Sequence, residues 1–257
     1  MIFDTHAHYD DEQFNEDRDE LIGAIHEGGV GRIVDICANA DSYRAVLELA
    51  HRYPFIYAAV GVHPDDVGKL DEAYFSQIER AACDDKCVAI GEIGLDYHWM
   101  VSPKEVQQEW FRRQIDLARR LKKPFVIHSR DAAADTLSVV KDEKSWEIGG
   151  VMHCFSYEVE MAREYLNMGF FLGVGGVVTY KNGRKLKEVV TYAPIEQILV
   201  ETDCPYLSPT PHRGERNNSS YIKYVIEEIA RLKNMESVAV EEITYQNACR
   251  FYNLSDS

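Results

Sequence analysis

Two histidines lie two positions apart near the start of the chain, in the stretch DTHAH, and imidazole nitrogens are common ligands for divalent metals. If residues 2–8 form a β-strand, successive side chains alternate between its two faces, so Asp4, His6 and His8 share one face. A face with three such groups either lies in water or is held together by something that binds the groups.

Four later runs of strand-like residues also end in a histidine or a carboxylate. VAIGEIG ends near Glu92, and PFVIH ends at His128. GVMHCF carries His153, and ILVETD ends at Asp203. With the N-terminal pair, the candidate metal ligands are His6, His8, Glu92, His128, His153 and Asp203. Four imidazoles and two carboxylates can hold one or two divalent cations and leave positions open for water, which is the arrangement of a hydrolytic metal site.

Short strands that alternate with helices along the whole chain would position these residues. The expected strands cover residues 2–8, 32–38, 56–62, 88–92, 125–128, 151–155, 170–174 and 197–201. Apolar residues at spacings of three and four predict helices between them, for example over 103–121 and 219–232. Eight such units predict an α/β protein with a TIM (β/α)8 barrel, in which the carboxyl ends of the strands form the active site.

A doubly wound open sheet is the alternative arrangement of such units. The chain has no Gly-x-Gly-x-x-Gly turn after an early strand, and the glycine-rich stretch at 173–176 comes late with a different spacing. No Pro/Gly/Ser-rich linker or low-complexity run divides the sequence. We therefore expect a single domain over residues 1–257.

The composition of the chain indicates which kinds of molecule the protein is expected to bind. The formal net charge of −15 excludes the overall basic character that supports non-specific nucleic-acid binding, so a phosphate-bearing substrate would need a metal or a local basic cluster. No run approaches eighteen apolar residues, and the N-terminus lacks the pattern of a signal peptide. Six scattered cysteines predict reduced thiols. We expect a cytoplasmic protein with no membrane contact and no obligate protein partner.

Six stretches of the sequence resemble the TatD family of metal-dependent deoxyribonucleases, which are amidohydrolase-like barrels. They are DTHAH (4–8), GVHP (61–64), GEIGLDY (91–97), HSRDA (128–132), HCFS (153–156) and ETDCPYLSPTPHRGERN (201–217). The resemblance implies that the six candidate residues are ligands of one or two divalent ions, such as Mg²⁺, Zn²⁺ or Mn²⁺. It also implies that Glu92 bridges two cations and that Asp203 orients or deprotonates the attacking water.

The family's activity, as the resemblance implies it, is hydrolysis of phosphodiester bonds in DNA, commonly as a 3′ to 5′ exonuclease. The expected partner is a DNA end or another phosphodiester substrate. Candidate substrate contacts are His63, Arg130, Arg213 and Arg216. Arg213 ranks first because the planar guanidinium fork suits phosphate. The basic residues at 181–185 either add to these contacts or form a solvated helix start.

Two positions depart from the family's pattern. Tyr157 follows HCFS where glycine is usual, and it either stacks on a base or is a surface ring. Ser219 and Ser220 stand where a proline usually follows the RGxRN segment. Asp4 lies two positions before His6 and is expected to hydrogen-bond beneath the metals rather than to ligate them.

Two other functions remain open at this point. The first is a metal-dependent ester or amide hydrolase of the amidohydrolase type, such as an aminoacyl-tRNA deacylase, because a metal-activated water serves both chemistries. The second is a non-enzymatic barrel that uses its metals as a structural staple or serves as a binding module, although structural metal sites normally have four protein ligands and no open position.

Overall fold

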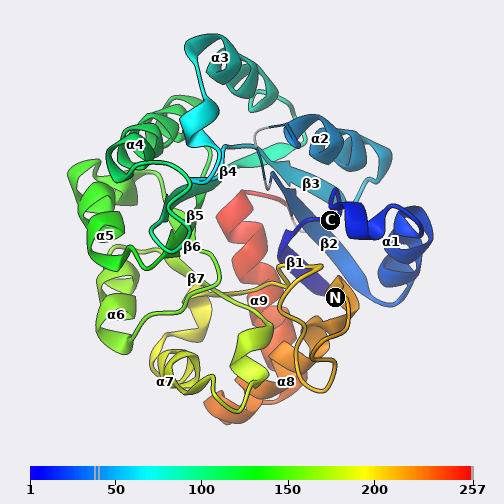
Figure 1. The fold of residues 1–257 in the computed structure, drawn as a ribbon. Coiled ribbons are helices and arrows are strands. Elements are labelled where there is room, and N and C mark those ends of the chain that lie inside the picture. Colours follow the sequence, from blue (N-terminus) through cyan, green and yellow to red (C-terminus); the bar gives the residue numbers. More distant parts are fainter. Residues whose placement is uncertain (38, 40, 256–257) are drawn as a thin grey trace. The chain divides into compact units, whose positions relative to one another are not determined.

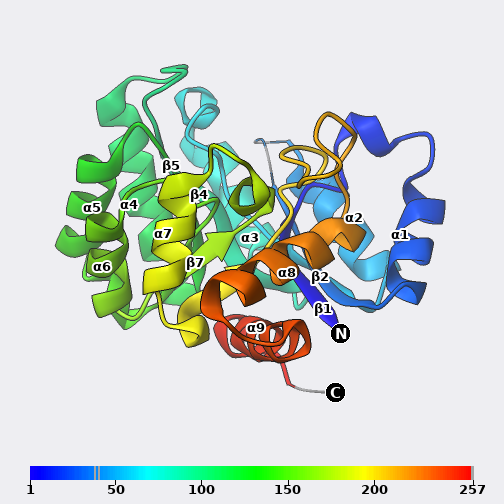
Figure 2. The same cartoon turned by 90° about the horizontal axis from the view of Figure 1, so that it is seen from below.

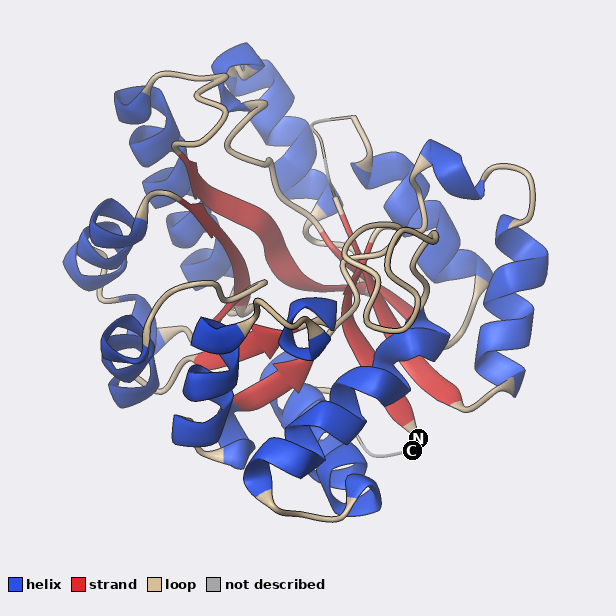
Figure 3. Ribbon diagram, turned by 60° about the horizontal axis from the view of Figure 1, so that its bottom comes forward, coloured by secondary structure: helices blue, strands red, loops and turns tan. Residues whose placement is uncertain are grey.

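The computed structural model describes residues 1–37, 39 and 41–255, and within these residues it contains eight strands that alternate with helices (Figure 1). The strands follow one another in the sheet in sequence order, from β1 to β8, and the pairings given below are parallel. Figure 3 shows the alternation of strands in red and helices in blue. This order is that of a (β/α)8 barrel and confirms the predicted fold class.

The bounds of the elements are as follows. The strands are β1 (Ile2–Ala7), β2 (Val30–Ile36), β3 (Ile56–Ala59), β4 (Cys87–Asp96), β5 (Phe125–Arg130), β6 (Gly150–Met152), β7 (Phe171–Val174) and β8 (Ile198–Val200). The α-helices are α1 (Arg18–Glu27), α2 (Tyr43–Arg52), α3 (Glu72–Ala81), α4 (Lys104–Leu121), α5 (Ala133–Asp142), α6 (Val159–Asn167), α7 (Arg184–Tyr192), α8 (Ile222–Lys233) and α9 (Ser237–Tyr252). Short 3-10 helices are η1 (Glu12–Phe14), η2 (Val67–Lys69), η3 (Ser145–Glu147), η4 (Gly176–Thr179), η5 (Ile195–Gln197) and η6 (Ser219–Tyr221).

All eight expected strands are present, with ends that differ by a few residues. The expected strand over 32–38 has its last residue, Ala38, outside the described residues. β4 is longer than expected because its pairing with β5 continues to Asp96, which lies opposite Arg130. β6 ends before His153. The helix expected over 103–121 is α4, and the helix expected over 219–232 is η6 followed by α8.

The chain forms two compact units, Met1–Asp35 with Cys154–Ser257, and Ile36–His153. In the first unit, α8 and α9 lie side by side next to the first residues of β1 (Figure 2). Phe3 packs against the rings of Tyr245 and Tyr252 on α9, and the Tyr252 hydroxyl donates to the carbonyl oxygen of Thr5. Since side chains alternate along a strand, Asp4 and His6 therefore lie on the opposite face of β1 from Phe3.

In the second unit, α4 is joined to the strands by two buried glutamines. The Gln114 side chain exchanges two hydrogen bonds with the backbone of Val62, and Gln107 does the same with Asp96. On β4, a Cβ at Gly94 would overlap the carbonyl oxygen of His128, and its φ of +145° suits glycine. Glycine therefore permits the close approach of the two strands beside His128.

Two expectations concern the chain as a whole. Among the residues that the structure describes, no helix is both long enough and apolar enough to cross a membrane. All six cysteines are free thiols, as expected.

Candidate metal centre

In the first unit, two histidines and an aspartate meet at the carboxyl end of β1. Nε2 of His6 and Nε2 of His8 are 3.1 Å apart, and Oδ1 of Asp203 lies 3.3 Å from Nε2 of His8 and 3.8 Å from Nε2 of His6. Both imidazoles are buried, whereas the Asp203 side chain is 19% exposed. Ligand atoms about 2.1 Å from one cation are themselves roughly 3 to 3.5 Å apart, so these three donors fit a divalent cation.

Backbone hydrogen bonds hold the two segments of this cluster together. The Asp203 amide donates to the His6 carbonyl oxygen, and the His8 amide donates to the Cys204 carbonyl oxygen, both at 2.9 Å. Asp203 has a φ of +57°, in the left-handed region that aspartate tolerates better than most residues. The turn after β8 thus places its carboxylate beside the His8 ring.

The Asp4 carboxylate lies fully buried next to this cluster and accepts four hydrogen bonds. Oδ1 accepts from the amides of His6 and Thr202, and Oδ2 accepts from the hydroxyls of Thr202 (2.6 Å) and Ser219 (2.7 Å). Burial raises the pKa of Asp4 to about 6, against the lowering effect of these hydrogen bonds. Its contacts are those of an orienting group, which is the role expected from the sequence.

Ser219, one of the departures from the family's pattern, has contacts that proline cannot make. Its amide donates to the Tyr9 hydroxyl at 3.0 Å, and its own hydroxyl contacts both that hydroxyl and Asp4. Proline has neither the N–H nor the hydroxyl. The serine therefore links the Asp4 carboxylate to the buried Tyr9 ring.

Glu201 is a buried carboxylate that the sequence reasoning missed. Its Oε1 accepts a hydrogen bond of 2.7 Å from the Cys154 amide, and it brings a carboxylate oxygen within 4.8 Å of a His6 ring nitrogen. The available signal was an acidic residue directly after a short apolar strand, two positions before Asp203. Glu201 therefore adds a second carboxylate to the cluster around His6.

In the second unit, Glu92 on β4 lies beside two of the expected histidines. Its Oε1 is 2.8 Å from Nδ1 of His128 and 3.8 Å from Nε2 of His153. His63, expected as a substrate contact, packs edge-on against the His128 ring with centroids 4.3 Å apart. His63, Glu92 and His128 each offer a donor atom within 4.8 Å of the others. His63 is thus placed among the candidate ligands of this unit.

Asp96 is a further residue that the sequence reasoning did not assign, and it contacts the other nitrogen of His128. Its Oδ2 is 2.9 Å from Nε2 of His128. Burial favours the neutral ring, but the hydrogen bonds to Asp96 and Glu92 outweigh it and raise the pKa of His128 to about 9. Burial also acts against the charge of Asp96, yet the bonds from His128 and from the amides of Trp99 and His98 lower its pKa to about 2. A cation that binds His128 must therefore displace a proton.

The three arginines expected as substrate contacts differ in what they touch. The Arg216 guanidinium forms a two-point ion pair with Asp17, at 2.8 and 2.5 Å, and also donates to the Gln13 carbonyl oxygen. The Arg213 guanidinium is exposed and lies 3.8 Å from the centroid of the Tyr180 ring. Arg130 is exposed at the end of β5. Arg213 and Arg130 are therefore exposed residues whose guanidiniums lie over aromatic rings, whereas the guanidinium of Arg216 is engaged in an ion pair.

The sequence left two possible roles for the basic residues near the start of α7 and for Tyr157, and the structure shows what these residues contact. Arg184 pairs with Glu188, and Lys185 pairs with Glu158, so these cations at the start of α7 are engaged on the surface. Tyr157 is half-buried, with its ring edge-on to Phe155 at 5.9 Å.

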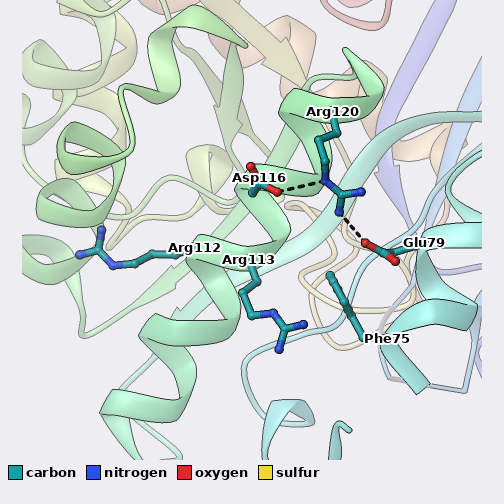
Figure 4. A pocket seen from close by; sticks show the side chains of 6 residues that line it. All are labelled: Phe75, Glu79, Arg112, Arg113, Asp116 and Arg120. Carbon is teal, nitrogen blue, oxygen red and sulfur yellow. Dashed lines mark hydrogen bonds and ion pairs between the residues drawn. The ribbon is translucent and has the colours of Figure 1, made fainter. Parts of the chain in front are cut away.

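A pocket between α3 and α4 contains three arginines but is poorly suited to bind phosphate (Figure 4). Arg120 pairs with Glu79 and Asp116. Arg113 forms a two-point pair with Glu72, and Arg112 pairs with the acidic residues at 142–143. Since every guanidinium already has a carboxylate partner, this pocket offers no unneutralised cation.

Comparisons with known proteins cover both units. The family model described as TatD related DNase matches residues 3–253. The chain is 45% identical over 255 residues to the "uncharacterized metal-dependent hydrolase YabD" of Bacillus subtilis, covering 99% of this chain and 100% of the relative. It is 33% identical over 260 residues to the metal-dependent hydrolase YcfH of Escherichia coli K12, covering 100% and 97%. The crystal structure of YjjV, a TatD homologue from Escherichia coli K12, matches with a TM-score of 0.92 at 29% identity, covering 99% and 98%.

Proposed function

This chain belongs to the TatD family and is a metal-dependent hydrolase, and from that premise we propose that it cleaves phosphodiester bonds at DNA ends as a 3′ to 5′ exonuclease. The observation that carries the proposal is the triangle of donor atoms from His6, His8 and Asp203, at 3.1 to 3.8 Å from one another. Three donors at this spacing suit a divalent cation, and the description of the matched family names DNA as the substrate.

The six ligands expected from the sequence divide into two sets, one in each unit. The first set is His6, His8 and Asp203, and the second is Glu92, His128 and His153. Each mixes imidazole with carboxylate, a combination that suits Zn²⁺ and Mn²⁺ and, through the carboxylates, Mg²⁺. When bound, such cations act as Lewis acids and lower the pKa of a water molecule.

Residues of the chain would carry out proton transfer, orient the metal ligands and bind the substrate. Asp203 is the one partly exposed member of its cluster, so it is the carboxylate that can accept a proton from the attacking water. Asp96 fixes the orientation of the His128 ring, and Asp4 fixes the backbone of His6. Arg130 and Arg213 are exposed residues, and their guanidiniums suit the phosphates of the substrate.

The test is hydrolysis of labelled DNA by the purified protein. Single- and double-stranded oligonucleotides labelled at the 5′ or the 3′ end are incubated with Mg²⁺, Mn²⁺ or Zn²⁺, with a chelator as control, beside a panel of aminoacyl esters. We expect metal-dependent shortening from the 3′ end. Turnover of esters without any shortening of DNA would overturn the proposal and favour the ester or amide hydrolase.

A further inference from the structure

The loop after β4 presents three consecutive large apolar side chains to solvent. Trp99 is 60% exposed, and Met100 and Val101 are exposed beside it. Tryptophan is highly buried on average in folded proteins, so an indole ring in water is an informative exception. In a (β/α)8 barrel this loop belongs to the face on which active sites are built.

A single carboxylate connects the Trp99 turn to a candidate metal ligand. Oδ1 of Asp96 accepts from the amides of His98 and Trp99, both at 2.9 Å, while Oδ2 contacts Nε2 of His128 at 2.9 Å. The backbone that carries the indole is therefore fixed to the same group that orients the His128 ring.

A cation lies against the exposed indole. The guanidinium carbon of Arg130 is 5.4 Å from the centroid of the Trp99 ring. Arg130 follows His128 by two positions on β5 and lies opposite Asp96 in the strand register. No carboxylate forms an ion pair with Arg130 among residues 1–37, 39 and 41–255, and the neighbouring Asp131 pairs instead with His98.

These two groups match the two parts of a nucleotide. An exposed aromatic ring can stack on an unpaired base, and a guanidinium binds the phosphate attached to it. We propose that Trp99 and Arg130 form a subsite for single-stranded DNA, with a base on the indole and its phosphate on the guanidinium, next to His128. This inference rests on the proposed function and deepens it, because a base held in a duplex cannot stack on the ring.

The binding test compares Trp99→Ala and Trp99→Phe with a matched control, Trp146→Ala. Trp146 is also an exposed tryptophan, at 44%, but it lies in η3, which leads into the amino end of β6. We expect Trp99→Ala to raise the KM for single-stranded DNA by about 5- to 100-fold with a much smaller change in kcat, Trp99→Phe to retain most of the affinity, and Trp146→Ala to match the parent protein.

Two further readouts separate stacking from a general structural effect. The protein has three tryptophans, so quenching of intrinsic fluorescence by an oligonucleotide should disappear in Trp99→Phe and persist in Trp146→Phe. An oligonucleotide with abasic positions at its 3′ end should bind the parent protein as weakly as the intact oligonucleotide binds Trp99→Ala. Arg130→Ala should weaken binding and reduce its dependence on salt.

The outcomes distinguish the subsite from the proposed function. If the parent protein shortens DNA but Trp99→Ala has the same KM and abasic DNA binds equally well, the subsite is wrong and the nuclease stands. If the parent protein shortens no DNA under any metal, the proposed function fails and the subsite fails with it. If Trp99→Ala raised the KM by the same factor for single-stranded and for double-stranded ends, a base-stacking role would also be contradicted.

Discussion

The side chains of Asp4 and Ser219 are joined by a hydrogen bond of 2.7 Å, although 215 positions separate them in the sequence. The bond connects the strand that carries His6 to the segment that follows the RGERN motif. The same carboxylate is fully buried and also accepts a hydrogen bond from the His6 amide. Ser219, which stands where the family usually has a proline, is thus hydrogen-bonded to a carboxylate next to the candidate metal centre.

Replacing Ser219 by alanine should lower the free energy of unfolding by about 1 to 3 kcal/mol, because a buried carboxylate loses a hydrogen-bond donor. Ser219→Pro should cost more, since the amide that donates to Tyr9 is also lost. Urea denaturation measures both changes. Ser220→Ala is the neighbouring control, because that hydroxyl donates to the local Asn218 side chain rather than to a buried carboxylate. Equal stability of the two alanine variants would contradict the role of Ser219.

Asp203→Asn should lower kcat by about 10²- to 10⁴-fold, because the amide cannot accept a proton from the attacking water. Steady-state kinetics with measured metal content provide the test. The control is Asp142→Asn, which alters an exposed carboxylate on α5 that pairs with Arg112. If Asp203→Asn kept full activity with its metal bound, another group would have to act as the base. Loss of the fold together with the metal would instead favour a structural staple.

A divalent cation should stabilise the metal-free protein by about 2.7 kcal/mol at a concentration 100 times its Kd. His6→Ala should abolish most of this gain, because it removes one of three closely spaced donors. His51→Ala is the control: His51 and its acidic neighbours form another possible metal group, but on the exposed surface. Thermal melts with and without Mn²⁺ distinguish them. If His51→Ala lost more of the stabilisation by Mn²⁺ than His6→Ala, the metal site would have to lie on that exposed surface instead.

The metal-free protein should lose stability as the pH rises from 6.5 to 9. The pKa of His128 is raised from 6.5 to about 9 in the folded state, so its protonated form stabilises the fold fully below pH 6.5, and that contribution disappears as the pH passes 9. The contribution is up to about 3 kcal/mol. Urea denaturation in chelator at pH 6 and pH 9 measures it. His128→Gln should remove this pH dependence, whereas His51→Gln, at an exposed histidine, should leave it unchanged.

Arg213 and Arg216 should respond differently to substitution, although they lie three positions apart. Arg213→Ala should raise the KM for DNA by about 10-fold with little change in stability, because Arg213 is exposed and is a proposed phosphate contact. Arg216→Ala should mainly lower stability, by up to about 1 kcal/mol, since it breaks the partly exposed pair with Asp17. Kinetics and urea denaturation on the same samples separate the two effects. The reverse pattern would assign the substrate contact to Arg216.

The fold class could be predicted because strand and helix periodicities are local properties of the sequence. The same is true of the shared face of Asp4 and His6, which depends only on the alternation along β1. Asp96 could not be predicted in the same way, because its role depends on how His128 on the next strand is oriented. Glu201 was missed for a similar reason: its burial depends on the packing around it rather than on the residues beside it.

The difference in contacts between Arg213 and Arg216 could not be predicted from the sequence either. Both stand in the PHRGERN stretch and have the same chemistry, but Arg216 meets Asp17 from a segment 199 positions away. Only the tertiary structure decides which cation is neutralised. The end of β4 shows the same dependence, since the strand continues to Asp96 because β5 is there to pair with it.

The bonds between β1 and the segment after β8 have a consequence for synthesis of the chain. Asp4 and Thr202, which share two hydrogen bonds, are 198 positions apart, and the His6 carbonyl receives the Asp203 amide in the same place. At 5 to 20 residues per second, the ribosome needs roughly 10 to 40 s to make the intervening chain. For that time the histidine pair exists without its carboxylate, so the cluster of His6, His8 and Asp203 is complete only after Asp203 has been synthesised.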